Sequence, residues 1–393
     1  FDWLKFNTNA VTSSYNFIEA VNRKIVIPDG YIGIYNAPQL NDIRQNLSGK
    51  YILMSDIDLS SWGEWSPIGY NSTGLNEATA FRGVFDGNGY VIKNINVDIV
   101  RERAHALAGL FGQTYMATIS NLGVMSGRIS AKASVYYARS YAGGIIGEAY
   151  DSEIINCFNS ATIYAQAEAS SNIGTESKAG GIIGQSINSL IRSCFNLGTI
   201  ETFGGEGSST CDCGGIIGLS MDSEVSTCYN NGTINSYGAK YGSDLGGIIG
   251  VFITEDDVNH NIKDCYNTGN INGKAIEYIA GYEGLGGIIG AVRNSGFLSI
   301  FNCYNTGTIT SQLTNQSNYI FIGGLLGHNE YRFEANYCYY LNNLESAVGY
   351  GANILLKNVS ALTTSQIKIQ SSFNGFDFES IWKISSTMNN GSP

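Results

Sequence analysis

A five-residue phrase recurs along the chain and constrains its fold more than any other feature. Gly-Gly-Ile-Ile-Gly occurs five times and returns once as Gly-Gly-Leu-Leu-Gly. The six copies begin at Gly143, Gly180, Gly214, Gly246, Gly286 and Gly323, and a shorter Gly-Leu-Phe-Gly begins at Gly109. The starts of the full copies lie 32 to 40 residues apart. A period in this range is typical of structural units that stack and bury their apolar faces against one another.

One cysteine follows each full copy, and we expect these cysteines to form a column. They are Cys157, Cys194, Cys228, Cys265, Cys303 and Cys338. Five of them end an Ile-x-x-Cys or Val-x-x-Cys pattern, and Leu122 takes the cysteine position after Ile119. Since a free thiol behaves as a small apolar side chain, we predict buried, reduced cysteines. If both ends of the pattern point inward, a bulge or corner must lie between them.

An asparagine stands two residues after most of these cysteines and predicts a second column. The asparagines are Asn159, Asn196, Asn230, Asn267 and Asn305. We expect their amides to bond backbone groups of adjacent turns as a ladder. Asparagine and glycine mark turns, and β-branched residues between them favour strands. The prediction is an all-β fold: a parallel, right-handed β-helix of about seven three-stranded turns.

The ends of the chain depart from the repeat, as the ends of a solenoid must. Residues 1–100 are interpreted as an N-terminal segment and capping region, with a short helix near residues 38–47. Residues 101–340 carry the repeats, and residues 341–393 are interpreted as a C-terminal cap. Because a stacked solenoid needs no lateral partner, we expect a monomer.

Composition excludes several classes of partner. Only 14% of residues are charged, the net charge is −11, and Lys and Arg do not cluster. This balance argues against nucleic acid and anionic membrane surfaces as partners. No apolar run approaches the roughly 18 residues of a membrane-spanning helix.

The sequence resembles the GLUG-repeat family. The resemblance rests on Tyr51–Leu59, Trp65–Gly69, Phe81–Gly89 and the repeated Gly-Gly-Ile-Ile-Gly phrase, and it covers roughly residues 37–390. Such repeats occur in secreted or surface-anchored bacterial proteins, including adhesin-like proteins and the non-catalytic parts of some immunoglobulin A metallopeptidases. The resemblance therefore implies an extracellular location, and it leaves the activity open because these repeats accompany different modules.

Catalytic motifs are missing from the sequence. The three histidines, His105, His260 and His328, do not begin the His-Glu-x-x-His helix that holds zinc in the peptidase relatives. Neither a Gly-x-Ser-x-Gly elbow nor a Walker A loop occurs. We therefore expect no enzymatic activity and no cofactor. The alternative is a carbohydrate-active β-helix, a lyase or hydrolase, whose paired carboxylates line an acidic groove.

Two acidic groups and a cysteine pair are candidate sites. Asp56 and Asp58 share one strand face, and a structural role, such as turn capping or Ca²⁺ bridging, is favoured over a catalytic one. Glu255, Asp256 and Asp257 lie in an insertion and are interpreted as a solvated acidic loop, with weak Ca²⁺ binding as the alternative. Cys211 and Cys213 admit three interpretations: a strained disulfide, a weak metal-ligand pair, or neither.

Long segments rich in Ser, Gly, Asn and Tyr join each repeat to the next. All leave the same corner of the turn, so we expect them to cluster on one side of the solenoid. Tyrosine gives a rigid amphipathic contact, and the small polar residues adapt to a ligand. The candidate ligand-binding residues are Tyr237, Tyr241, Tyr278 and Tyr282. Two interpretations stay open: a face that binds glycan or a host protein, and spacer loops on a stalk.

Overall fold

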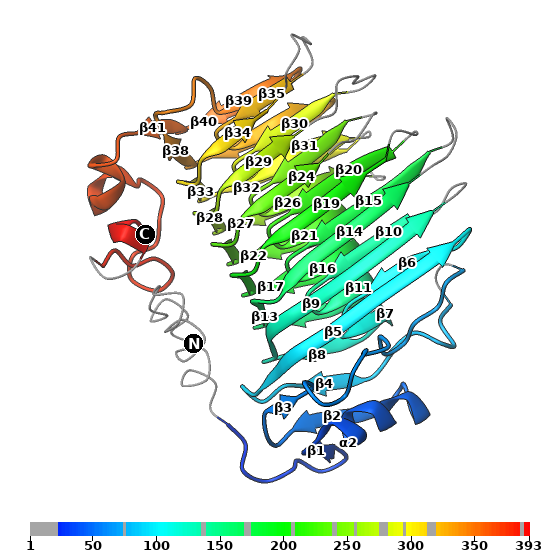
Figure 1. The fold of residues 1–393 in the computed structure, drawn as a ribbon. Helices are drawn as coiled ribbons and strands as arrows, with labels where there is room; N and C mark the ends of the chain where they lie inside the picture. Colours follow the sequence, from blue (N-terminus) through cyan, green and yellow to red (C-terminus); the bar gives the residue numbers. More distant parts are fainter. Residues whose placement is uncertain are drawn as a thin grey trace.

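The chain winds into a parallel β-solenoid of about seven turns, which confirms the fold class expected from the repeat. The computed structural model describes residues 23–73, 76–134, 139–168, 174–205, 209–237, 242–254, 258–274, 282–293, 296–312, 320–385 and 389–393. Strands of successive turns lie side by side in rows along the solenoid (Figure 1). Among the described residues, no helix is long and apolar enough to cross a membrane.

Each full turn contributes to four sheets, numbered here in the order in which one full turn meets them. Sheet 1 contains β6 (Ala106–Ala108), β10 (Arg139–Gly143), β15 (Thr175–Gly180), β20 (Ser209–Gly214), β25 (Ser243–Gly246), β30 (Glu283–Gly286) and β35 (Ile320–Gly323). Sheet 2 contains β7 (Phe111–Tyr115), β11 (Ile146–Tyr150), β16 (Ile183–Ile187), β21 (Ile217–Met221), β26 (Ile249–Ile253), β31 (Ile289–Arg293), β36 (Leu326–Asn329) and β39 (Val348–Gly351).

The other two sheets complete the turn. Sheet 3 contains β1 (Ile32–Ile34), β2 (Lys50–Leu53), β4 (Val84–Asp86), β8 (Thr118–Ser120), β12 (Glu153–Ile155), β17 (Leu190–Arg192), β22 (Glu224–Ser226), β27 (Asn259–Lys263), β32 (Phe297–Phe301), β37 (Arg332–Asn336) and β40 (Ile354–Lys357). Sheet 4 begins with β3 (Ile57–Asp58), β5 (Val91–Glu102) and β9 (Gly123–Ser134).

Beyond β9, sheet 4 divides into two rows, to which each full turn adds one strand apiece. One row holds β13 (Phe158–Asn159), β18 (Phe195–Asn196), β23 (Tyr229–Asn230), β28 (Tyr266–Asn267), β33 (Tyr304–Asn305), β38 (Tyr339–Leu341) and β41 (Ser360–Leu362). The other holds β14 (Thr162–Glu168), β19 (Ile200–Gly204), β24 (Ile234–Tyr237), β29 (Ile271–Lys274) and β34 (Ile309–Ser311).

The Gly-Gly-Ile-Ile-Gly phrase forms a corner, which is why the turn has four sheets where three strands were expected. Gly180 ends β15, and the chain bends before Ile183 begins β16. A Cβ atom on Gly181 would lie 2.2 Å from the carbonyl oxygen of Gly215 and 2.5 Å from the side chain of Asn196. Only glycine fits so close to a neighbouring backbone, so the phrase marks a bend.

The expected corner within the Ile-x-x-Cys pattern is present. The residue before each repeat cysteine has a positive φ, for example 60° at Ser193 and 50° at Thr227. This left-handed residue reverses the alternation of side chains, so Ile191 and Cys194 both point into the core. Polar residues with positive φ, such as Asn188 at 49°, also turn the chain between sheets 2 and 3.

The N-terminal end of the solenoid holds one short helix. Helix α2 (Ala37–Asp42) begins after Asn36, whose side chain accepts a hydrogen bond from the backbone N–H of Gln39. A 3-10 turn, η2 (Ile43–Gln45), follows α2 directly. Leu40 and Ile43 are fully buried, so this end covers the core of the first turns.

The C-terminal region divides into a last turn and a segment along the side. Strands β39, β40 and β41 extend sheets 2, 3 and 4. Residues 363–385, including η3 (Gln366–Lys368) and η4 (Gln370–Ser372), then lie beside the stack (Figure 1). They cover a column of stacked rings on sheet 4, where Trp382 lies 5.6 Å from the ring of Tyr304. A final 3-10 turn, η5 (Asn389–Gly391), ends the chain.

Candidate functional site

The six repeat cysteines form a column inside the solenoid. Each is fully buried and free. The backbone N–H of Cys194 lies 3.4 Å from Sγ of Cys228, and that of Cys228 lies 3.5 Å from Sγ of Cys265. Burial raises the pKa of the Cys194 thiol, which keeps it neutral. The column therefore supplies packing and lacks the electropositive, accessible setting of a reactive thiol.

The five asparagines form a continuous hydrogen-bonded ladder. The Nδ2 of each of the first four donates to Oδ1 of the asparagine one turn on, over 2.9 Å from Asn196 to Asn230 and 2.8 Å from Asn267 to Asn305. Within its own turn, Asn230 also bonds both the N–H and the carbonyl of Gly232, at 3.1 and 2.9 Å. All five side chains are fully buried. The ladder thus satisfies turn groups that the sheets leave free.

The structure places two of the four candidate tyrosines on different sheets. Tyr237 ends β24 in sheet 4, is half-buried, and has the Nζ of Lys274 6.0 Å from its ring. Tyr282 precedes β30 of sheet 1 and is 47% exposed. Tyr241 and Tyr278 lie outside the described residues, as do Glu255, Asp256 and Asp257.

Tyr282 belongs to a group of four rings at the C-terminal end of sheets 1 and 2, here called the aromatic cluster. The other members are Phe321 on β35, His328 on β36 and Tyr350 on β39. Phe321 stacks on Tyr350 at 4.6 Å and on His328 at 5.2 Å, and Tyr282 lies 5.3 Å from His328. Tyr350 is 57% exposed and His328 is buried. Burial lowers the pKa of His328, so its ring is neutral near pH 7.

Sequence reasoning missed three members of the aromatic cluster, although a signal existed. The residue after each Gly-Gly-x-x-Gly phrase enters one column of sheet 2, where Leu219, Val251 and Ala291 precede His328 and Tyr350. The column begins with three polar residues, Gln113, Glu148 and Gln185, is aliphatic over the next three turns, and becomes aromatic only at its last two positions. Aligning the copies on this position would have revealed the change.

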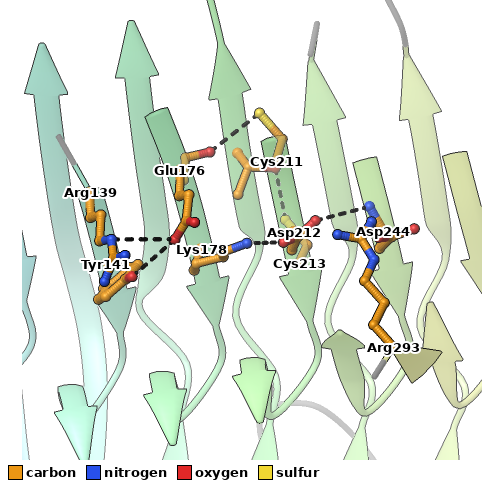
Figure 2. Close-up of polar contacts among 11 residues, drawn as sticks. Arg139, Tyr141, Glu176, Lys178, Cys211, Asp212, Cys213, Asp244 and Arg293 are labelled. Atoms are coloured by element: carbon orange, nitrogen blue, oxygen red, sulfur yellow. Dashed lines mark hydrogen bonds and ion pairs between the residues drawn. The ribbon is translucent and has the colours of Figure 1, made fainter. Parts of the chain in front are cut away.

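A row of charged side chains crosses sheet 1 on the face toward sheet 2 (Figure 2). Lys178 on β15 directly contacts Asp212 on β20, and their side chains are 4% and 0% exposed. The backbone N–H of Asp244 on β25 donates to Oδ1 of Asp212 over 3.3 Å. Arg293, on β31 of sheet 2, pairs with the carboxylate of Asp244. These four residues are called the charged row below.

The charged row lies beside the two cysteines whose role the sequence left open. Side chains alternate along β20, so Cys211 and Cys213 lie on the face opposite Asp212, toward sheet 4. Cys213 lies 3.0 Å from Oγ1 of Thr202 on β19, and Cys211 accepts a hydrogen bond from Ser177 over 3.3 Å. Both thiols are free and buried.

Three acidic residues elsewhere in the described chain have close partners. Asp56 accepts hydrogen bonds from the N–H of Val91 and from Lys93, and Asp58 accepts from Ser60. Glu148 accepts from Gln113 over 2.7 Å and from Tyr150 over 2.8 Å. Burial raises the pKa of Glu148.

One small pocket lies on the outer surface of sheet 3. It has a volume of about 210 Å³ and Glu224 as its one carboxylate, and ligand sites usually occupy about 300–1,000 Å³. In the ranges that the structure describes, His, Cys, Asp and Glu form no group of three that could hold a metal ion.

Comparisons with known proteins agree with the repeat and the fold. Residues 138–164 match the family model described as the GLUG motif, which confirms the resemblance seen in the repeats. The structure is similar to that of a proposed immunoglobulin A1 protease from Bacteroides ovatus, with a TM-score of 0.50 and 18% identity over 92% of this chain and 91% of that chain. At this identity the similarity shows a shared fold.

A second solved structure, of an IgA1 protease, is 17% identical with a TM-score of 0.45. The match covers 79% of this chain but only 22% of that protein. No curated protein matches the sequence.

Proposed function

We propose that this chain is a non-catalytic repeat module of a secreted or surface-exposed bacterial protein, and that it binds glycan through the aromatic cluster. The GLUG motif at residues 138–164 and the solenoid fold support the module. The aromatic cluster carries the binding proposal, because it exposes ring surface at the C-terminal end of sheets 1 and 2, where Tyr282 and Tyr350 are 47% and 57% exposed.

The geometry of the aromatic cluster suits a sugar ring. Phe321, His328 and Tyr350 are within 25° of parallel and stack on one another, and the exposed ring surface comes from Tyr350 and Tyr282. An aromatic face is electron-rich and attracts the polarised C–H groups of a pyranose. Arg293 lies on the neighbouring strand with its side chain 31% exposed, and it could donate hydrogen bonds to sugar hydroxyls.

Competing functions find less support in the structure. A stalk would need no exposed aromatic cluster, although it would use the same stacked turns. A carbohydrate-cleaving enzyme would need two accessible carboxylates at a defined separation. The carboxylates of Asp212 and Asp244 are instead buried and paired with cations. A host protein as ligand would be an outcome of the same binding test.

A glycan array probed with the intact chain tests the proposal. We expect binding to a defined set of glycans and a loss of at least about tenfold in affinity in the Tyr282→Ala/Tyr350→Ala double variant, equivalent to about 1.4 kcal/mol. Tyr35→Ala is the matched control, because Tyr35 is 50% exposed near the opposite end of the solenoid. Binding that survives in the double variant would exclude the aromatic cluster, and an array without binding would favour the stalk.

A further inference from the structure

We propose that Lys178 and Asp212 are joined by an intramolecular isopeptide bond that ties two adjacent turns together. Their Cα atoms are direct partners in the parallel pairing of β15 with β20. Both side chains extend from the same face of sheet 1 and are in direct contact (Figure 2). This inference rests on the charged row alone and does not depend on glycan binding.

Burial distinguishes this pair from other Lys–Asp pairs of the described chain. In the pairs of Lys93 with Asp56, Lys132 with Asp98 and Lys24 with Asp86, the lysine side chain is at least 35% exposed. Water there keeps both groups ionised and would oppose amide formation. The side chains of Lys178 and Asp212 are 4% and 0% exposed. Burial opposes the charged amine of Lys178, but the carboxylates of Asp212 and Glu176 raise its pKa overall, so the two groups start as an ion pair. Lys178 must therefore pass a proton to the adjacent carboxylate before an amide can form.

We assign the proton relay to Asp244, whose carboxyl accepts hydrogen bonds from the N–H of Gly284 and from Arg293 in this structure and must turn toward the pair to act. Asp244 follows Asp212 in the same column of sheet 1, and its backbone N–H holds Oδ1 of Asp212. Burial raises the pKa of Asp244 to about 7, so a substantial fraction carries a proton near neutral pH. Arg293 holds the Asp244 carboxyl from sheet 2, and Glu176, two residues before Lys178, adds a further negative charge nearby.

The reaction balances without an external reagent. The neutral Nζ of Lys178 attacks Cγ of protonated Asp212, which forms a C–N bond and a tetrahedral carbon. The carboxyl of Asp244 accepts a proton from Nζ and delivers a proton to the hydroxyl that leaves Cγ. The C–O bond breaks, and one water molecule departs. The product is an amide, and Asp244 returns to its starting protonation state.

The location suits a covalent tie. In a solenoid each turn contacts only its neighbours, so local opening between two turns can spread along the stack. The bond would close a loop of the chain that spans a full turn between β15 and β20. It would thereby raise kinetic stability by blocking separation of these turns.

Intact-mass measurement of the denatured, purified chain tests the bond. We expect a mass lower than the sequence mass by one water molecule. Proteolysis should then yield a branched peptide that links Lys178 to Asp212. The Lys178→Met/Asp212→Leu double variant removes both charges together, so neither is left buried without its partner, and it should have its full sequence mass.

Two further variants separate the bond from other dehydrations. Asp244→Asn should slow formation of the branched peptide at least about tenfold in freshly purified protein, because the proton relay is lost. Lys132→Met, in an exposed pair, should leave the mass deficit intact. A wild-type chain of full sequence mass would overturn the proposal. A mass deficit without the branched peptide, as a cyclic imide would give, would also overturn it.

Discussion

Replacing Asn230 with leucine tests whether the asparagine ladder stabilises the solenoid. Asn230 is fully buried and takes part in four hydrogen bonds, two with Gly232 and one each with Asn196 and Asn267. Leucine has a similar shape and can make none of them. The N–H and carbonyl of Gly232 lose their side-chain partner, whereas Asn196 and Asn267 each keep bonds within their own turns.

The structure sets the size of the expected effect. A buried polar group left without a partner costs about 1–3 kcal/mol. Two such groups predict a loss of about 2–6 kcal/mol in the free energy of unfolding. Urea denaturation followed by circular dichroism measures the loss, and hydrogen exchange at Gly232 shows whether it is local.

A matched variant separates the ladder from a general effect of leucine. Asn343 is exposed, so Asn343→Leu should change the free energy of unfolding by no more than about 0.5 kcal/mol. If Asn230→Leu has an effect equally small, the ladder is only a turn preference and the reasoning is refuted.

Three other substitutions probe the core, a buried acid and the side segment. Cys228→Asp places an unpaired charge in the cysteine column, so the solenoid should unfold locally around it. The other thiols of the column should then react with a thiol reagent without denaturant, whereas Cys228→Ala should keep them protected. Burial raises the pKa of Glu283 from 4.5 to about 7, so the folded state binds an extra proton and stability falls as pH rises across that window. Glu283→Gln should therefore make the melting temperature depend less on pH between about pH 5 and pH 7. An unchanged slope of melting temperature against pH would contradict this. Trp382→Ala should weaken docking of residues 363–385 by about 3–5 kcal/mol and make them susceptible to limited proteolysis. Unchanged cleavage would show that other contacts hold the segment.

The repeat predicts those parts of the fold that every turn shares. Six copies of one phrase predict stacking, and the residue types at its conserved spacings predict the buried cysteine and asparagine positions. The number of sheets was not accessible in this way. Gly181 reads equally well as part of a strand, and only its contact with Asn196 in the folded chain shows that it turns a corner.

Features that occur once leave no periodic signal. Lys178, Asp212 and Asp244 occupy one column of sheet 1, but Gly284 and Phe321 continue the same column without charge. Their pairing depends on register between turns whose connecting loops vary in length. The aromatic cluster likewise joins residues from three strands of two sheets. Such sites require the three-dimensional register before their members can be recognised together.

The central claim is that the chain is a binding module without catalysis. To test it, the intact chain is incubated with a glycan that it binds, and both the affinity and the recovered glycan are then measured. The account predicts that the glycan is recovered unchanged after prolonged incubation and that affinity falls at least about tenfold in the Tyr282→Ala/Tyr350→Ala variant. Shortened or unsaturated products that form with the wild-type chain would contradict the account and identify a carbohydrate-active enzyme.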